Sequence, residues 1–247
     1  MLIDPWLEGA ATIVLPAFHQ AQLADEPVAL QALPKLDALV LALPYPDHTQ
    51  AATLRRLPRD LPVVAPPIAA WLAWLEGGLR DFRPIRGAGL AGGEADVGRV
   101  RVTYARGGWF DPTHNVLLFR GLDSGDTVLY CPHGMILGGH GEARISEALR
   151  GPPDVLLCSF THLDLPGWLG GVANLGEQAA VDVIRRFAPR FVTRTHDGVN
   201  PDCGFIAAQT TTTRCPDVSA AVAGLSEVVT LGIGDRWSLG GRVESVV

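Results

Sequence analysis

The sequence predicts a layered α/β sandwich that forms a single domain over residues 1–247. Strand-like segments outnumber helical ones, and helices separate several of the strands, as in layered α/β folds. Several strand-like segments are nearly continuous apolar runs, which is typical of strands covered on both faces. The length suits one large core, and no repeat, linker or low-complexity tract divides the chain.

The composition is that of a protein without a membrane segment. Hydrophobic residues make up 47% of the chain and charged residues 19%, and charged side chains interrupt every long apolar run. Asp4 and Glu8 stand where a secretory signal has basic residues, so we expect a cytoplasmic protein with no membrane partner. The net charge of -6 and the lack of a dense basic cluster argue against nucleic acid.

The cysteines predict neither a disulfide framework nor a metal knuckle, because the four of them are too few and too scattered. Cys158 lies within an apolar run, which predicts a buried, reduced thiol. A disulfide between Cys203 and Cys215 is the less favoured alternative in a chain of cytoplasmic type.

The N-terminal half alternates short strands with helices. Pro5 ends the first strand because proline lacks a backbone donor. Thr49 is the expected N-cap of the first helix, and Pro67 begins the second helix, which ends before a glycine. The expected elements are a strand at 1–7, a loop at 9–35, a strand at 36–43, a helix at 51–57, a strand at 62–65 and a helix at 67–77.

Strands dominate from residue 99 onward. Residues 121–126 have the composition of a hairpin turn between two apolar strands. Residues 176–188 are amphipathic, with Ala180, Ile184 and Phe187 on one helical face. The expected elements are strands at 99–105, 116–120, 127–131, 154–160, 190–195, 227–231 and 236–239 and helices at 145–150, 176–188 and 217–225.

Residues 87–92, Gly-Ala-Gly-Leu-Ala-Gly, formally match the GxGxxG fingerprint of dinucleotide-binding proteins. That fingerprint requires a strand before the glycines and a helix N-terminus after them, because the helix end binds the phosphates. Here a charged, proline-containing segment precedes the glycines and another glycine follows them. The sequence therefore favours a flexible loop over a nucleotide site.

Four of the seven histidines follow strand-like runs within a few residues: His48, His133, His162 and His196. Open α/β sheets bind ligands beyond the carboxyl ends of their strands, so these side chains are expected at one edge. Imidazoles with one or two carboxylates are ligands of zinc or, with fewer histidines, of iron or manganese. The alternative is that each histidine is an ordinary loop or capping residue.

Other catalytic arrangements are weak or absent in the sequence. There is no GxSxG nucleophile elbow, no GxxxxGK[ST] phosphate loop and no HExxH zinc motif. Cys131 and His133 suggest a Cys–His nucleophile. We do not favour this pairing over the histidines that follow strands.

A succession of segments carries a family resemblance. The segments are residues 2–7, 37–43 leading to Asp47-His48, 54–57, 63–66, 125–130 and 190–196. Together they resemble the metallo-β-lactamase superfamily over most of the chain. The resemblance implies an α/β fold, a four-layer αββα sandwich of two mixed β-sheets flanked by helices. More closely, residues 130–134 and 234–237 resemble the "YxPHG/C" and "GDRF" elements of a cyanobacterial and plant branch.

The chain departs from the superfamily's HxHxDH signature, which supplies three histidines and one aspartate to two metals. The aligned residues 43–48 read Leu-Pro-Tyr-Pro-Asp-His, so Leu43 and Tyr45 replace both leading histidines. The family's next histidine ligand is also missing, because Arg106, Gly107 and Gly108 follow the strand at 99–105. The resemblance therefore implies that the first metal site is lost.

The second site is retained in the same alignment. Asp47 and His48 match the end of the signature, and His196 lies where the superfamily has its late histidine. His133 falls at the position of the bridging acid. Three histidines and one aspartate are a sound set for one Zn²⁺, Fe²⁺ or Mn²⁺ ion.

Two functions follow from this degenerate signature. The first is a hydrolase of a small molecule with at most one divalent transition metal, in which Asp47 is a ligand or a catalytic general base. The second is a metal-free pseudoenzyme or binding module on the same fold. The superfamily's known substrates range from β-lactams to phosphodiesters, and the fold does not select among them.

The chain begins at the Asp-Pro strand, which in the superfamily usually follows a β-hairpin. Either a later start codon is used or one sheet lacks its edge strands. An open sheet edge favours pairing with another chain, so we expect a homodimer.

Several loop residues have more than one interpretation. His162 is either a solvent-exposed loop residue, which we favour, or a residue beside the site. Asp111 and His114 are candidates to replace part of the lost first-site set. His140 lies in a glycine-rich loop that could close over the site.

Three large apolar residues are expected in loops around the site: Trp109, Trp168 and Leu169. They form either the wall of an apolar pocket or a cover for the core.

Overall fold

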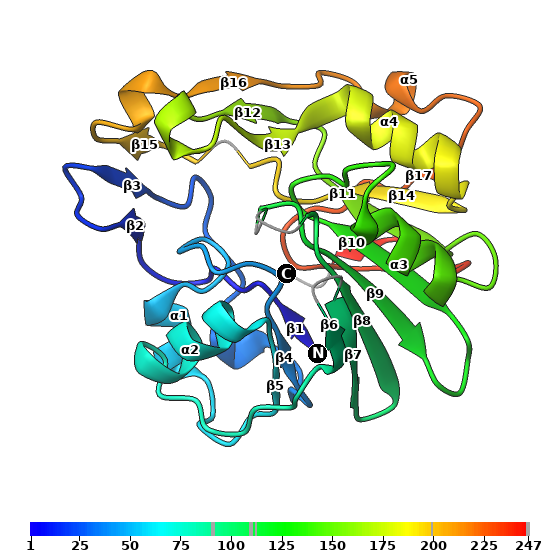
Figure 1. The fold of residues 1–247 in the computed structure, drawn as a ribbon, viewed down its shortest axis with the longest axis horizontal. Coiled ribbons are helices and arrows are strands. Elements are labelled where there is room, and N and C mark those ends of the chain that lie inside the picture. The colour runs from blue at the N-terminus through cyan, green and yellow to red at the C-terminus, as the bar shows by residue number, and fades with distance from the viewer. Residues whose placement is uncertain (90–91, 109–110, 112, 199, 246–247) are drawn as a thin grey trace.

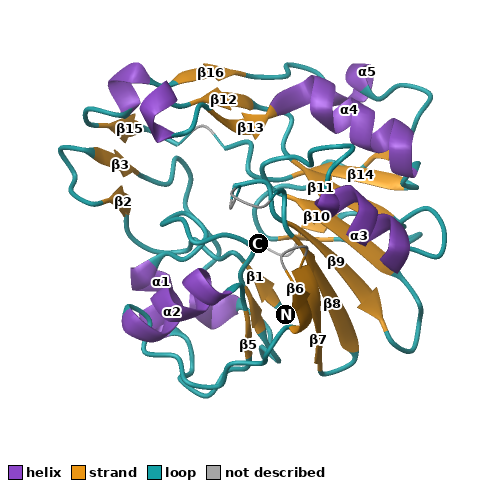
Figure 2. Cartoon of the chain, in the orientation of Figure 1, coloured by secondary structure: helices purple, strands orange, loops and turns teal. Residues whose placement is uncertain are grey.

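The chain folds into four layers in the order helices, sheet, sheet, helices (Figure 1). The structure is a computed structural model that describes residues 1–89, 92–108, 111, 113–198 and 200–245. Figure 2 shows the helices on the two outer sides and the strands between them. The αββα sandwich implied by the family resemblance is confirmed.

The smaller central sheet has the strand order β1-β4-β5 and consists of β1 (Leu2–Ile3), β4 (Leu39–Val40) and β5 (Val63–Val64). Both of its strand pairings are parallel, so among the described residues this sheet is not mixed as the resemblance implies. Crossover connections that contain a helix bring the chain back to the same end of the sheet, which gives parallel strands. Residues 38–43 are fully buried, as the apolar run predicts, although the paired strand is shorter.

The larger sheet is mixed and has the order β17-β14-β11-β10-β9-β8-β7-β6. Its strands are parallel from β17 to β10 and antiparallel from β10 to β6. They are β6 (Arg86–Gly89), β7 (Gly92–Val97), β8 (Val100–Ala105), β9 (Val116–Gly121), β10 (Thr127–Cys131), β11 (Val155–Cys158), β14 (Phe191–Arg194) and β17 (Glu227–Val228).

The alternation of side chains along β4 divides the core. Val40 and Ala42 face the larger sheet and pack with its inner residues, including Val102 and Leu117. Leu39 and Leu41 face the other way and pack under α1 (Ala51–Arg56) and α2 (Pro67–Leu75). Apolar residues on both faces of β4 therefore join two layers of core.

Three helices cover the outer face of the larger sheet: α3 (His140–Ala148), α4 (Gly176–Phe187) and α5 (Val218–Ala221). The predicted face of α4 is buried, with Ala180, Ile184 and Phe187 in this core. The helix expected at 145–150 begins earlier, at His140. The expectation that His140 belongs to a loop over the site is therefore wrong, because the residue lies in the first turn of a helix.

Two small sheets extend the sandwich on the side where β10, β11 and β14 end (Figure 1). One has the order β13-β12-β16, from β12 (His162–Asp164), β13 (Val172–Leu175) and β16 (Thr211–Thr213). The other has the order β15-β3-β2, from β2 (Ala11–Ile13), β3 (His19–Ala21) and β15 (Asp202–Cys203). The prediction of a loop at 9–35 is thus wrong for residues of β2 and β3. Strand β3 also pairs with β15, which lies far along the sequence.

The remaining short elements are three 3-10 turns and one strand pair. The turns are η1 (Leu30–Ala32), η2 (Gly167–Leu169) and η3 (Ala207–Gln209), and the pair is β18 (Asp235–Arg236) with β19 (Glu244–Ser245). The helix expected at 217–225 and the closing strands expected at 227–231 and 236–239 are shorter than predicted.

Gln50, not Thr49, caps helix α1. The side-chain oxygen of Gln50 accepts a hydrogen bond from the Thr53 amide at 2.7 Å, which satisfies a free donor of the first turn. The hydroxyl of Thr49 donates instead to the Tyr45 carbonyl at 2.9 Å. The prediction of a Thr49 cap is wrong because this threonine stabilises the turn before the helix.

The GxGxxG segment is a β-hairpin, with Gly87 and Gly89 on β6 and Gly92 on the antiparallel strand β7. Leu90 and Ala91 lie outside the described residues. A Cβ on Gly92 would lie 2.0 Å from the Tyr104 carbonyl oxygen, so the glycine is required by the close approach of β8. No helix N-terminus follows the glycines, and the flexible loop expected here is replaced by strands.

The cysteines that the structure describes are all free, and Cys158 is buried as predicted. The alternative disulfide between Cys203 and Cys215 is not formed. Within the described ranges, every helix is too short or too polar to cross a membrane.

Candidate metal centre

The carboxyl ends of three strands bring four side chains together. Asp47 and His48 lie in the turn that follows β4, where the His48 amide bonds to the Tyr45 carbonyl at 2.9 Å. His133 follows β10, and His196 follows β14. Each of the four offers one ligand atom, and these atoms lie within 4.8 Å of one another. Three of the four histidines expected at this edge therefore converge with Asp47, whereas the fourth, His162, lies outside the group.

The four side chains are in direct contact. Nε2 of His48 lies 3.1 Å from Nε2 of His133 and 3.7 Å from Oδ2 of Asp47. Nε2 of His196 lies 2.9 Å from the same Asp47 oxygen. His48 and His133 are 1% and 5% exposed, whereas about a quarter of the His196 and Asp47 side chains is accessible. The cluster is buried on one side and open on the other.

Asp4 orients the His48 ring through Nδ1, the ring nitrogen that does not face the other clustered residues. Its Oδ2 lies 2.8 Å from Nδ1 of His48, and a carboxylate can only accept, so Nδ1 carries the proton. The same carboxylate accepts hydrogen bonds from the Tyr130 hydroxyl at 2.9 Å and the Ala42 amide at 2.7 Å. In the neutral ring, Nε2 of His48 therefore presents its lone pair toward the cluster.

The rings of His133 and His196 are held by stacking. Their Nδ1 atoms are buried and have no hydrogen-bond partner among the described residues. The Tyr45 ring lies parallel to the His133 ring at 6.1 Å, and the His48 ring stacks on His196 at 4.9 Å. Packing, not a second hydrogen bond, sets the direction of these two imidazoles.

The charges of the cluster suit metal binding. Burial raises the pKa of Asp47. The adjacent His48 and the hydrogen bond from His196 lower this pKa by more than burial raises it, so it lies well below its usual range. Burial lowers the pKa of His133 and the nearby imidazoles lower it more, which keeps that ring neutral. Burial also lowers the pKa of His48, but Asp4 and Asp47 overcome this effect and raise it.

The spacing of the four atoms fits a first-row metal. Ligands about 2.0–2.1 Å from a tetrahedral Zn²⁺ ion lie about 3.4 Å from one another. The contacts here, 2.9, 3.1 and 3.7 Å, lie on either side of that value. A neutral His133 and an ionised Asp47 are also the protonation states that a metal requires, whereas His48 must lose a proton from Nε2 to bind one.

Leu43 and Tyr45, which the family resemblance aligns with two signature histidines, make packing contacts. Leu43 is fully buried in the core between the sheets. Tyr45 stacks on His133, and its hydroxyl lies 2.7 Å from the Thr113 hydroxyl. Both side chains are therefore engaged in apolar or neutral contacts.

Asp111 and His114 pair with each other at 2.7 Å and do not belong to the cluster. His114 is 6% exposed, and its Nε2 has no partner among the described residues. His162 lies on β12, not in a loop, and contacts Asp164 at 3.0 Å and the Leu175 carbonyl at 3.2 Å. None of these three residues has a ligand atom within the group of four.

A pocket of about 1020 Å³ opens over the cluster. Its wall includes Asp47, His48, His133 and His196 together with side chains of both small sheets. Leu169 lines it, as the expectation of an apolar wall requires. Trp168 lies beside Phe18 and Phe205 and is outside the lining. Trp109 is not among the described residues.

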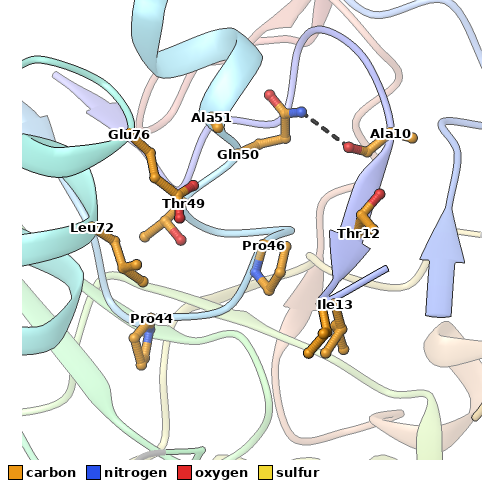
Figure 3. Close-up of a pocket in the computed structure, with 11 residues that line it drawn as sticks. Ala10, Thr12, Ile13, Pro44, Pro46, Thr49, Gln50, Ala51, Leu72 and Glu76 are labelled. Carbon is orange, nitrogen blue, oxygen red and sulfur yellow. Dashed lines mark hydrogen bonds between the residues drawn. The ribbon is translucent and has the colours of Figure 1, made fainter. Parts of the chain in front are cut away.

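A second pocket, of about 330 Å³, shares Ile13, Pro44 and Pro46 with the large pocket (Figure 3). Pro44 and Pro46 form its base, and Ile13 and Leu72 lie on opposite sides of it. Gln50 crosses its upper end and donates a hydrogen bond to the Ala10 carbonyl at 3.1 Å. The pocket contains none of the four clustered residues.

The sequence did not indicate two carboxylates that support the cluster from outside it, Asp4 and Asp197. Asp197 accepts hydrogen bonds from the Ser159 hydroxyl and from the amides of Phe160 and Thr161, at 2.6 to 3.0 Å. These hydrogen bonds connect the end of β11 to the segment that carries His196. His196 has a φ of 58°, which is rare for a residue with a side chain. The Asp-Pro strand was a signal for Asp4, but its partner His48 is not adjacent in sequence.

Comparison with known proteins gives a fold-level result. No protein-family model and no curated protein sequence matches the chain. A possible metal-dependent hydrolase from Veillonella parvula matches 99% of this chain and 91% of its own, with a TM-score of 0.64 and 17% identity. An isothiocyanate hydrolase from Delia radicum gut bacteria matches 92% and 88%, with a TM-score of 0.63 and 14% identity.

A metallo hydrolase from the archaeon Ignicoccus hospitalis matches 87% of this chain and 81% of its own, with a TM-score of 0.54 and 15% identity. Identities this low establish architecture alone. The layered arrangement of the sheets and the similarity to these neighbours together show that the chain has the metallo-β-lactamase fold.

Proposed function

We propose that the protein is a hydrolase that uses one divalent transition metal held by Asp47, His48, His133 and His196. The observation that carries this proposal is the convergence of their four ligand atoms within 4.8 Å at the bottom of a large pocket. The neighbours described as a "possible metal-dependent hydrolase" and a "novel metallo hydrolase" support the reaction class.

The metal, when bound, would polarise a carbonyl or phosphoryl oxygen and lower the pKa of water. The chain's own residues prepare for it. Asp4 holds the proton of His48 on Nδ1 so that Nε2 stays available. Leu43 and Tyr45 occupy the positions of the first-site histidines, which favours a single ion.

Asp47 suits the role of ligand better than that of general base. A general base works best when its pKa is near the working pH. The neighbouring imidazoles hold the pKa of Asp47 far below that range, so its carboxylate takes up a proton poorly. One carboxylate oxygen already accepts from His196, which fixes the group beside the three imidazoles.

The test is hydrolysis by metal-free protein and by protein loaded with Zn²⁺, Mn²⁺ or Fe²⁺. The substrates are chromogenic esters, thioesters, lactones, phosphodiesters and an isothiocyanate, the last because a structural neighbour is described by that activity. We expect metal-dependent turnover of at least one class that is lost in His133→Ala and retained in His162→Ala. Turnover that is equal in metal-free and loaded protein would contradict the proposal.

A metal-free binding module is the second candidate, and one observation favours it. Nε2 of His48 and Nε2 of His133 can share one proton at 3.1 Å, while His196 donates to Asp47 at 2.9 Å. The ligand atoms of the cluster can therefore pair with one another without an ion. This candidate predicts that His133→Ala weakens folding but changes no metal content.

A further inference from the structure

One wall of the large pocket is a single face of the sheet β13-β12-β16. The pocket-lining residues alternate along two of its strands and their ends: Thr161, Leu163 and Leu165 on one, and Thr210, Thr212 and Arg214 on the other. Side chains two apart on a strand point the same way, so these six face the pocket together. His162 and Asp164, which lie between them, pair with each other instead.

Arg214 gives this wall a positive end. Among the lysines and arginines that the structure describes, it alone lines the pocket. Its guanidinium makes no ion pair or hydrogen bond with any described residue. An arginine without a partner beside a pocket, in a chain with 26 acidic and 20 basic residues, is available to a ligand.

The carboxylates that line the same pocket are mostly engaged. Asp4 and Asp47 contact the clustered imidazoles, and Asp202 lies 3.7 Å from His19. Asp25 is the remaining acid in the lining and is exposed to solvent. The anion-binding capacity of Arg214 is therefore not already used by a neighbouring acid.

Two buried polar atoms in the wall also lack partners. Thr161 and Asn174 are 6% and 3% exposed and line the pocket. Oγ1 of Thr161 and Oδ1 of Asn174 have no hydrogen-bond partner among the described residues. Buried polar atoms are rarely left unpaired, so these two favour a ligand with a polar group beside them.

Apolar side chains make up much of the remaining pocket lining. Leu163, Leu165 and Leu169 line the pocket from the β12 side, and Leu23 and Val28 line it from the segment after β3. A pocket with mainly apolar walls and a few polar groups binds an organic molecule through its hydrocarbon body and orients it through the polar groups.

We infer that the pocket binds an amphiphilic organic anion, with its carboxylate or phosphate at Arg214 and its hydrocarbon body against Leu163, Leu165 and Leu169. A polar group of the same molecule lies beside Thr161 and Asn174. This assignment names the substrate class of the proposed hydrolase and rests on that function for the reacting end of the molecule.

The test is calorimetric titration of the full chain with octanoate, octyl phosphate and octanol. We expect both anions to bind at least about tenfold more tightly than octanol, because a charge-assisted hydrogen bond to guanidinium is added. Arg214→Gln removes this preference and leaves octanol binding unchanged. Arg150→Gln is the matched control, since Arg150 is exposed, as Arg214 is, but lies outside the lining. Leu163→Ser weakens all three ligands.

Carboxylates and phosphates also bind metals, so the titration is repeated with His133→Ala. Anion binding that still depends on Arg214 in this variant supports the inference whether or not the proposed hydrolase activity exists. Equal affinities for octanoate and octanol, or an Arg214→Gln variant that binds octanoate as the wild type does, would overturn it. The tighter of the two anions identifies the group that Arg214 recognises.

Discussion

Nδ1 of His48 lies 2.8 Å from Oδ2 of Asp4, and the two side chains are 1% and 3% exposed. This contact joins the end of β1 to the turn after β4, 44 residues later. A buried carboxylate that accepts from a histidine fixes the tautomer and increases the basicity of the other ring nitrogen. Asp4 is therefore a positioning residue for the proposed metal ligand His48.

Asp4→Asn should weaken metal binding about 10–100-fold, because the amide keeps the size of the side chain but removes its charge. Competition with a chromogenic zinc chelator measures the change. Tyr130→Phe is the control, since it removes one hydrogen bond to Asp4 and leaves the contact with His48. An Asp4→Asn protein with the wild-type metal affinity would show that His48 does not depend on this contact.

Metal affinity should fall as the pH is lowered, because a proton competes with the metal at Nε2 of His48. Asp4 and Asp47 raise the pKa of His48 above its ordinary value of 6.5, so the competition begins at a higher pH than for a free histidine. His133, whose pKa is lowered, is already neutral and adds no proton. Calorimetry in buffers of different ionisation enthalpy should show His48 releasing one proton per metal below its raised pKa.

The folding stability of the metal-free protein should fall as the pH rises, whereas metal affinity rises with pH. The protonated His48 and Asp4 form an ion pair, and the raised pKa means that this pair stabilises the folded state. The contribution is complete below pH 6.5 and is lost as the pH rises through the raised pKa. Urea unfolding of metal-free protein across this range tests the sign, and a stability that increases with pH in the wild type but not in His48→Gln would contradict it.

Asp197→Ala should destabilise the protein by about 3 kcal/mol, since it leaves several buried donors unpaired. The side chain is 6% exposed and accepts hydrogen bonds from Ser159, Phe160 and Thr161. Urea unfolding measures the loss. Metal affinity should fall in parallel, because the same carboxylate holds the segment that carries His196. Asp182→Ala, an exposed aspartate on α4, should change neither quantity.

The layers could be predicted from the sequence because burial on both faces leaves a local pattern. The run at 38–43 is fully buried, and the amphipathic face of α4 packs as its periodicity indicates. The hairpin of β2 and β3 was missed because its strands are short and partly polar, and its outer partner β15 follows about 180 residues later. Such strands are defined by their neighbours and not by their own residues.

The candidate site could be predicted in part for a similar reason. Histidines that follow strands are visible in the sequence, and the four-residue cluster forms where three such strands end. Asp4 and Asp197 contact residues far from them in the chain, and an aspartate or arginine alone gives no local signal. The small sheet that carries Arg214 was likewise not indicated, since its strands are only three or four residues long.

The metal content of the purified chain tests the central claim most directly. After loading with zinc, manganese or iron and removal of excess ion, elemental analysis should give about one equivalent of metal per chain. His48→Ala and His133→Ala should each lose it, whereas His162→Ala, which lies outside the cluster, should keep it. Less than about a tenth of an equivalent in the loaded wild type, or two equivalents, would contradict a single ion bound by Asp47, His48, His133 and His196.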